Sequence, residues 1–245
     1  MTRANELLAT ALCGLSAKPA ETAPAAMKKR YSELVSNAVA PAFAAELRAR
    51  GLTGSRPAPP GPAGASGAER RMAGAIGAKK VDVTWATEES GLLLAISIKS
   101  INWRDARSSN FQKNMTNRRG DLLYEAVTLH RRFPYAVLGG FIFLDKDAAN
   151  DGTPNRRSTF LNAHSRLRLF DGRNDPAGRD EQYERLYVVL LDATPAKARW
   201  EIYRVGDPVT TLDLADVFSD LVALVVERNP DFYEVGTAGN LLRTP

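Results

Sequence analysis

An aspartate, a serine and a lysine lie in two short apolar segments that follow one another closely in the chain. Asp82 stands within K-K-V-D-V-T-W, and Ser97 and Lys99 end the run L-L-L-A-I-S-I-K. Both segments have the composition of β-strands, and a short polar turn separates them. Because side chains alternate along a strand, Ser97 and Lys99 should share one face, opposite Ile96 and Ile98. The sequence therefore predicts that a carboxylate, a hydroxyl and an ammonium group converge on one side of a hairpin.

These groups are suited to the hydrolysis of a phosphodiester bond. That reaction needs a divalent cation on hard oxygen ligands, a water that loses its proton nearby, and neutralisation of the charge that gathers on phosphorus. Asp82 could supply one ligand and the backbone carbonyl of Ile98 a second, while Lys99 could orient or activate the water. A second carboxylate is desirable, and the hairpin itself lacks one.

Composition narrows the kind of metal site that we expect. The 245 residues include one cysteine, Cys13, and two histidines, His130 and His164. Neither a cysteine-based zinc site nor a multi-histidine centre can be built from these, so oxygen ligands remain, which suit magnesium, manganese or calcium. The glycine-rich phosphate-binding motifs of dinucleotide-binding and P-loop proteins are absent from the sequence.

Positive charge is concentrated directly after the second predicted strand. The net charge is +5, and residues 99–119 hold six basic residues against the single acid Asp105, an excess as large as that of the whole chain. A solvated loop and helix face would explain this charge, but its place beside the candidate site favours a polyanion partner. Trp103 could stack on a base or could cap the core. The predicted nucleic-acid contacts are Trp103, Arg104, Arg107, Lys113, Arg118 and Arg119.

The chain divides by composition into three parts. Residues 1–50 have a helical pattern, with Pro41 expected to kink or divide the second helix. Residues 51–66 are rich in proline and glycine and read as a linker. Residues 67–245 should form the main domain, in the order helix, two strands, helix, strand, helix, two strands and helix, with an irregular tail. This order predicts an α/β (α+β) fold, with a central mixed sheet flanked by helices. The expected helices cover 67–77, 111–132, 158–171 and 211–229, and the later strands cover 135–145, 183–193 and 198–205.

The pattern D82-x(14)-S97-I98-K99, on a hairpin between two helices, resembles the active-site motif of the PD-(D/E)XK nuclease superfamily. That superfamily includes most Type II restriction endonucleases, and the resemblance covers about residues 67–193. It implies a restriction-endonuclease-like fold and a Mg²⁺-dependent endonuclease, with Mn²⁺ as a possible substitute. It also implies double-stranded DNA as the substrate, a homodimer as the acting unit and a role in host defence.

The motif departs from the family pattern at two positions. Val81 stands where a proline is common, and Ser97 stands where the family usually has an aspartate or glutamate. Some restriction endonucleases also have S-x-K at this position and carry the acid on the following helix. Their acid usually lies about half as far beyond the lysine as Glu125 does here, and this chain has Gln112 and Lys113 at that nearer spacing.

Several carboxylates could replace the missing one. Glu125 on the following predicted helix is preferred, with Asp121 one turn earlier as the alternative. Glu69 on the preceding predicted helix is a further candidate, because members of the superfamily often contribute an acid from that helix. Glu88 and Glu89 are closer in sequence, but they lie in the hairpin turn, too far along the strand.

Two other functions fit the same residues. The serine at position 97 would also suit a nuclease-fold protein without activity, serving as a DNA-binding or assembly module. A nuclease acting on RNA or branched DNA is equally compatible, because phosphate contacts carry no sequence information. No apolar run approaches the roughly 18–20 residues that span a bilayer. Since Glu6 and the helical spacing around it also argue against a signal peptide, we expect a cytoplasmic protein without a membrane partner.

Overall fold

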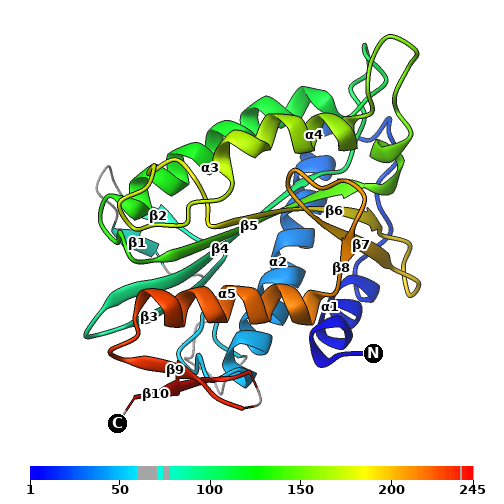
Figure 1. Cartoon of the computed structure of the whole chain (residues 1–245). Helices are drawn as coiled ribbons and strands as arrows, with labels where there is room; N and C mark the ends of the chain where they lie inside the picture. The colour runs from blue at the N-terminus through cyan, green and yellow to red at the C-terminus, as the bar shows by residue number, and fades with distance from the viewer. Residues whose placement is uncertain (60–70, 74–77, 238, 245) are drawn as a thin grey trace.

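A six-stranded mixed sheet forms the centre of the fold (Figure 1). The computed structural model describes residues 1–59, 71–73, 78–237 and 239–244. The strands lie in the order β3-β4-β5-β6-β7-β8; β4, β5 and β6 run parallel, whereas β3, β7 and β8 are antiparallel to their neighbours. This is the mixed sheet flanked by helices that the sequence predicts. The strand bounds are β3 Val83–Thr87, β4 Gly91–Ile101, β5 Val137–Asp145, β6 Arg185–Asp192, β7 Arg199–Arg204 and β8 Thr211–Leu212.

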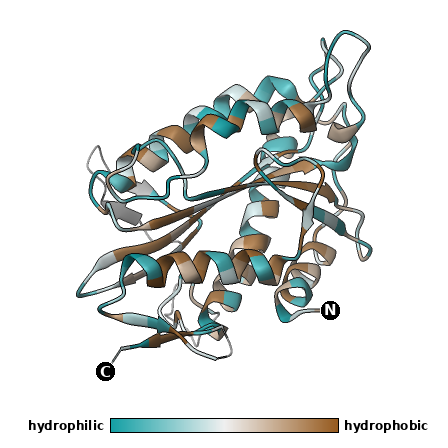
Figure 2. Cartoon of the chain, viewed as in Figure 1, coloured by the Kyte–Doolittle hydropathy of each residue, from teal (hydrophilic) through white to brown (hydrophobic). Residues whose placement is uncertain are grey.

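Helices cover both faces of this sheet. One face carries α1 (Arg3–Cys13), α2 (Ala25–Ala49) and α5 (Leu214–Arg228), and the other carries α3 (Met115–His130) and α4 (Thr159–Leu167) (Figure 1). Two hydrophobic clusters fill the two interfaces. Figure 2 shows the pattern that follows, with hydrophobic central strands and hydrophilic residues on the outer sides of the helices. Three short 3₁₀ turns complete the helical elements: η1 Gln112–Asn114, η2 Lys146–Ala149 and η3 Arg168–Phe170.

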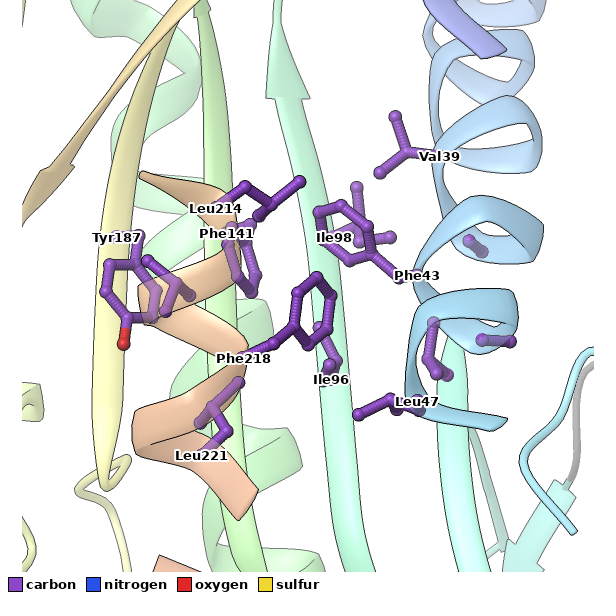
Figure 3. Close-up of a cluster of buried hydrophobic side chains, with 14 of the residues drawn as sticks. Val39, Phe43, Leu47, Ile96, Ile98, Phe141, Tyr187, Leu214, Phe218 and Leu221 are labelled. Atoms are coloured by element: carbon purple, nitrogen blue, oxygen red, sulfur yellow. The ribbon is translucent and has the colours of Figure 1, made fainter. Parts of the chain in front are cut away.

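Helix α2 packs along the sheet through a row of apolar side chains spaced four residues apart. Tyr31, Val35, Val39, Phe43 and Leu47 are all buried, as their helical spacing indicates. Phe43 makes edge contacts with the rings of Phe141 on β5 and Phe218 on α5, at centroid distances of 4.9 and 5.2 Å (Figure 3). The helix continues through Pro41, which lies on its exposed side, so the expected division of this segment does not occur.

The N-terminal helical region, residues 1–50, shares a core with the sheet. A single cluster of buried residues contains Leu8 and Phe43 together with Ile96, Phe141 and Phe218. The first part of the Pro/Gly-rich segment is also tied to the sheet, because Arg56 exchanges backbone hydrogen bonds with Thr84 on β3. Residues 60–66 of the predicted linker lie outside the described part of the chain. Where the structure describes them, the helical region and the predicted main domain therefore pack as neighbours.

Two expectations about short segments are wrong. Residues 71–73 of the predicted helix 67–77 form a strand, β1 (Arg71–Ala73), paired with β2 (Ala78–Lys80). Glycines at 74 and 77 weaken a helix at this point in the sequence. The tail, expected to be irregular, forms an antiparallel hairpin of β9 (Tyr233–Val235) and β10 (Leu241–Arg243). In the described residues, no helix is long and apolar enough to cross a membrane.

Candidate active site

The hairpin of β3 and β4 places Asp82 beside Ile98. The last pair of the antiparallel register is Val83 with Ile96, so Asp82 lies just beyond the paired part of β3. There its Oδ2 accepts a hydrogen bond of 2.6 Å from the backbone N–H of Ile98. Because the N–H and C=O of one residue in an extended strand point to the same edge, the Ile98 carbonyl also points toward this side. The two oxygen ligands expected from the sequence therefore lie next to one another.

Alternation along β4 directs Ser97 and Lys99 toward α3. Ile96 and Ile98 point the opposite way, into the cluster that β4 shares with α2 and α5 (Figure 3). The polar side chains consequently project from the face that α3 covers, where Ser97 is buried and only 15% of the Lys99 side chain is exposed. This is the division of faces that the sequence predicts.

Glu125 on α3 brings a second carboxylate to the hairpin. Ser97 Oγ donates a hydrogen bond to Glu125 Oε1, and the other carboxylate oxygen, Oε2, lies 3.4 Å from Lys99 Nζ. Lys99 Nζ also lies 3.7 Å from Asp82 Oδ2. The lysine thus stands between two carboxylates, one from the hairpin and one from the helix.

The charge balance of this group keeps Lys99 protonated. Burial disfavours its ammonium form, but the nearby charges of Glu125 and Asp82 outweigh that effect and raise the pKa of Lys99 above its usual value. A protonated lysine can orient a water molecule and offset negative charge, although it cannot accept a proton.

The other candidate acids lie elsewhere. Asp121 is partly buried one turn before Glu125, and its Oδ2 accepts a bond of 3.4 Å from Arg118. Glu89 lies in the β3–β4 turn, where it pairs with Arg243 of β10. Glu69 falls outside the described residues, so its position relative to Asp82 is not given by the structure.

Sequence reasoning missed Tyr183, whose hydroxyl lies 3.2 Å from Ser97 Oγ. This side chain is buried just before β6, and burial together with the charge of Glu125 raises its pKa well above the usual value. Tyr183 and Ser97 are 86 positions apart in the sequence, and no sequence pattern indicates that they are in contact. Only the parallel pairing of β4, β5 and β6 brings the two residues to one face of the sheet.

The site opens into a cleft of about 1310 Å³ with a basic lining. Asp82, Ile98 and Lys99 all line this cleft, whereas Glu125 lies behind them. Of the predicted nucleic-acid contacts, four contribute to the lining and two, which the structure also describes, lie outside it. The four are Trp103, Arg104, Lys113 and Arg118, and the two are Arg107 and Arg119.

Several of these side chains already have protein partners. Arg104 lies 3.3 Å from Asp147, and Lys113 lies 2.6 Å from Asp105. The hydrogen bond from Lys113 lowers the pKa of Asp105 to about 2. Trp103 is only 9% exposed and donates its ring N–H to the carbonyl of Pro19. It also packs edge-on against Tyr31, so most of its ring serves the core.

The polar side of α2, which sequence reasoning did not assign, also lines the cleft. Its lining residues recur at helical spacing, on the side of α2 away from the buried apolar row. They are Ala25, Lys28, Lys29, Ser32, Glu33, Ser36 and Asn37, of which Lys29 lies 3.9 Å from Glu33. The signal that could have identified this side is the alternation of these polar positions with Tyr31, Val35 and Val39.

The oxygen donors at the site suit a magnesium ion. Within the described ranges, no group of three or more His, Cys, Asp or Glu side chains has the arrangement of a metal site. Magnesium, however, retains several waters and is commonly held in proteins through one or two carboxylates. Asp82, Glu125 and the Ile98 carbonyl are the hard oxygen donors that could hold such an ion here.

Comparison with known proteins found no protein-family model, curated protein or solved structure that matches this chain. The resemblance to the PD-(D/E)XK superfamily stays a prediction from Asp82, Ser97, Lys99 and the hairpin that carries them.

Proposed function

We propose that this protein is a metal-dependent endonuclease that hydrolyses phosphodiester bonds in duplex DNA, of the Type II restriction kind and active in host defence. The observation that carries the proposal is the position of Lys99 Nζ, 3.7 Å from Asp82 and 3.4 Å from Glu125, in the lining of a basic cleft. The carboxylate that the strand lacks at Ser97 comes from α3 and reaches the same lysine. Carboxylates that can hold a divalent cation, and a nearby ammonium that can offset charge on phosphorus, are groups suited to phosphodiester hydrolysis.

Each residue has a separate task in this proposal. Asp82, Glu125 and the Ile98 carbonyl would hold Mg²⁺ or Mn²⁺, and the bound cation would supply Lewis-acid activation of the scissile phosphodiester. The ammonium of Lys99 would stabilise the charge that gathers on phosphorus and orient the attacking water by a hydrogen bond. Ser97 would hold one oxygen of Glu125, which fixes the direction in which the carboxylate points.

The basic residues that line the cleft would bind the nucleic-acid backbone. Arg104, Lys113 and Arg118 come from the segment after β4, and Lys28 and Lys29 come from α2. These cations could neutralise phosphates near the scissile bond. Because a duplex has two strands, a homodimer with two such sites would allow both to be cut.

Cleavage of supercoiled plasmid tests this proposal. The wild type should nick and linearise the plasmid in Mg²⁺ or Mn²⁺, and Asp82→Ala and Lys99→Ala should each slow cleavage by at least about 100-fold. Glu227→Gln, an exposed acid on α5, is the matched control and should cut as the wild type does.

The outcomes separate the alternatives. A wild type that leaves plasmid intact across metals and salt concentrations contradicts a duplex DNA endonuclease. Binding without cleavage would then favour a DNA-binding or assembly module, and parallel assays with RNA and branched DNA test the other nuclease substrates. Equal cleavage by wild type and variants would show that the catalytic residues lie elsewhere. A discrete set of fragments would indicate sequence-specific restriction.

A further inference from the structure

Tyr183 and Ser97 form a hydrogen-bonded chain that ends on Glu125. All three side chains are buried: their residues are 1%, 2% and 0% exposed, respectively. Ser97 Oγ donates to Glu125 Oε1 and also lies 3.2 Å from the hydroxyl of Tyr183. Buried polar groups destabilise the fold unless each hydrogen-bond donor has an acceptor.

The direction of the chain follows from counting protons. An ionised carboxylate can only accept hydrogen bonds, and a serine hydroxyl has a single proton to give. Because Ser97 gives that proton to Glu125, a hydrogen bond between Ser97 and Tyr183 can form only with Tyr183 as the donor. The phenol has two acceptors within reach, Ser97 Oγ at 3.2 Å and the carbonyl of Leu122 at 3.4 Å. Donation to the nearer acceptor gives the order Tyr183 to Ser97 to Glu125.

The phenol at the start of this chain is held rigidly. The backbone N–H of Tyr183 donates to the Phe170 carbonyl at 2.7 Å, and its own carbonyl accepts from Gly172 and Arg173. The ring lies beside Gly140 of β5, where an added Cβ would be in ordinary contact with it, at 3.4 Å from two of its atoms. Groups that orient a ligand are effective when their own positions are fixed in this way.

The chain also distinguishes the two oxygens of Glu125. Oε1 is engaged by Ser97, while Oε2 lies beside Lys99, which lines the cleft. Because one oxygen accepts a hydrogen bond from Ser97, the carboxylate is held in an orientation that directs its other oxygen toward Lys99. The bond to Ser97 therefore fixes the direction in which Glu125 presents its second oxygen.

We propose that Tyr183 is a positioning residue that acts through Ser97 to present Glu125 Oε2, together with Asp82, to a divalent cation. This inference rests on the proposed function for the identity of the ligand. It gives the serine a definite use at the position where the superfamily usually has an acid: Ser97 is the link between a distant tyrosine and the acid on α3.

The test is calorimetric titration of Mn²⁺ into the full-length protein without nucleic acid. Tyr183→Phe removes the hydroxyl and keeps the ring, and partners that orient metal ligands typically change metal affinity by about 10- to 100-fold. We expect Tyr183→Phe to weaken Mn²⁺ binding by about 10-fold or more. Tyr187→Phe is the matched control, because this buried tyrosine of β6 points into the opposite cluster (Figure 3); its affinity should stay within about twofold of the wild type.

A double-mutant cycle with Ser97→Ala separates positioning from general damage to the fold. If Tyr183 acts through Ser97, the double variant should bind Mn²⁺ as Ser97→Ala alone does, within about twofold. If the double variant instead loses Mn²⁺ affinity by the product of the two single losses, the inference is wrong. It is also wrong if Tyr183→Phe binds Mn²⁺ as tightly as the wild type does. If Tyr183→Phe does not fold, the test rests on Ser97→Ala, which should bind Mn²⁺ about 10-fold more weakly than the wild type. Wild-type Mn²⁺ affinity of Ser97→Ala would then overturn the inference.

The same measurements distinguish a wrong nuclease proposal from a wrong role for Tyr183. A wild type that binds no Mn²⁺ would remove the proposed metal site and this inference with it. A wild type that binds Mn²⁺ and cleaves DNA, with no effect of Tyr183→Phe, would leave the nuclease proposal intact and reject the role of Tyr183 alone.

Discussion

The ammonium of Lys99 compensates two carboxylates that would otherwise repel each other. Glu125 is fully buried, and only 18% of the Asp82 side chain is exposed, so solvent screens this repulsion weakly. The raised pKa of Lys99 is the counterpart of that arrangement, because the cation is stabilised by Glu125 and Asp82 more than burial penalises it. The ammonium of Lys99 thus stabilises both carboxylates of the candidate site.

Replacing Lys99 with methionine should destabilise the fold at neutral pH by about 1–3 kcal/mol, because two largely buried carboxylates lose the ammonium group that lies between them. Urea unfolding at pH 7 measures this, with the exposed Lys197→Met as control. A loss no larger than that of the control would argue against the pairing.

At the scale of single elements, the hairpin could be predicted from the sequence and the position of its partner helix could not. Alternation alone assigns Ser97 and Lys99 to one face, because the period of a strand is fixed by its geometry. Glu125 lies 26 residues after Lys99, and that spacing does not say where α3 crosses the sheet. The hairpins of β1 with β2 and β9 with β10 were missed since strands of three residues are too short to show a period.

Helix α2 should contact the nucleic acid through the lysines on its cleft side. Replacing Lys28 and Lys29 with alanine should weaken binding of a DNA duplex. It should also lower the slope of log K against log salt concentration by about 0.9 for each phosphate that the protein no longer neutralises. Fluorescence anisotropy in EDTA measures binding while the duplex stays intact, and Lys197→Ala is the control. An unchanged slope of log K against log salt concentration would indicate that the nucleic-acid backbone does not contact α2.

At the scale of the whole molecule, the N-terminal helices complete the core instead of forming a separate unit beside it. The composition break at residues 51–66 correctly marks a change in local structure, since α2 ends at Ala49. Composition could not show that α2 returns to cover β4, because that depends on contacts between segments far apart in the chain. Phe43 and Val39 are buried in one cluster with Ile96 and Phe141, which shows that the apolar row of α2 packs on the sheet.

Truncation of Phe43 tests this shared core. Phe43→Ala removes ring contacts with both Phe141 and Phe218 (Figure 3) and should cost about 3–5 kcal/mol of unfolding free energy. Met27→Ala, on an exposed position of the same helix, should change stability by less than about 0.5 kcal/mol. Chemical denaturation followed by circular dichroism measures both, and a loss below about 1 kcal/mol for Phe43→Ala would mean that α2 contributes little to the core.

In the proposed site, Glu125 supplies the carboxylate missing at Ser97. Single-turnover rates of plasmid cleavage by Glu125→Gln, Asp121→Asn and Glu69→Gln, side by side in Mg²⁺ and Mn²⁺, test this role. We expect Glu125→Gln to slow cleavage by at least about 100-fold, while Asp121→Asn stays within a few-fold of the wild type. Wild-type cleavage by Glu125→Gln, with the loss appearing instead in Asp121→Asn or Glu69→Gln, would show that another residue supplies the carboxylate.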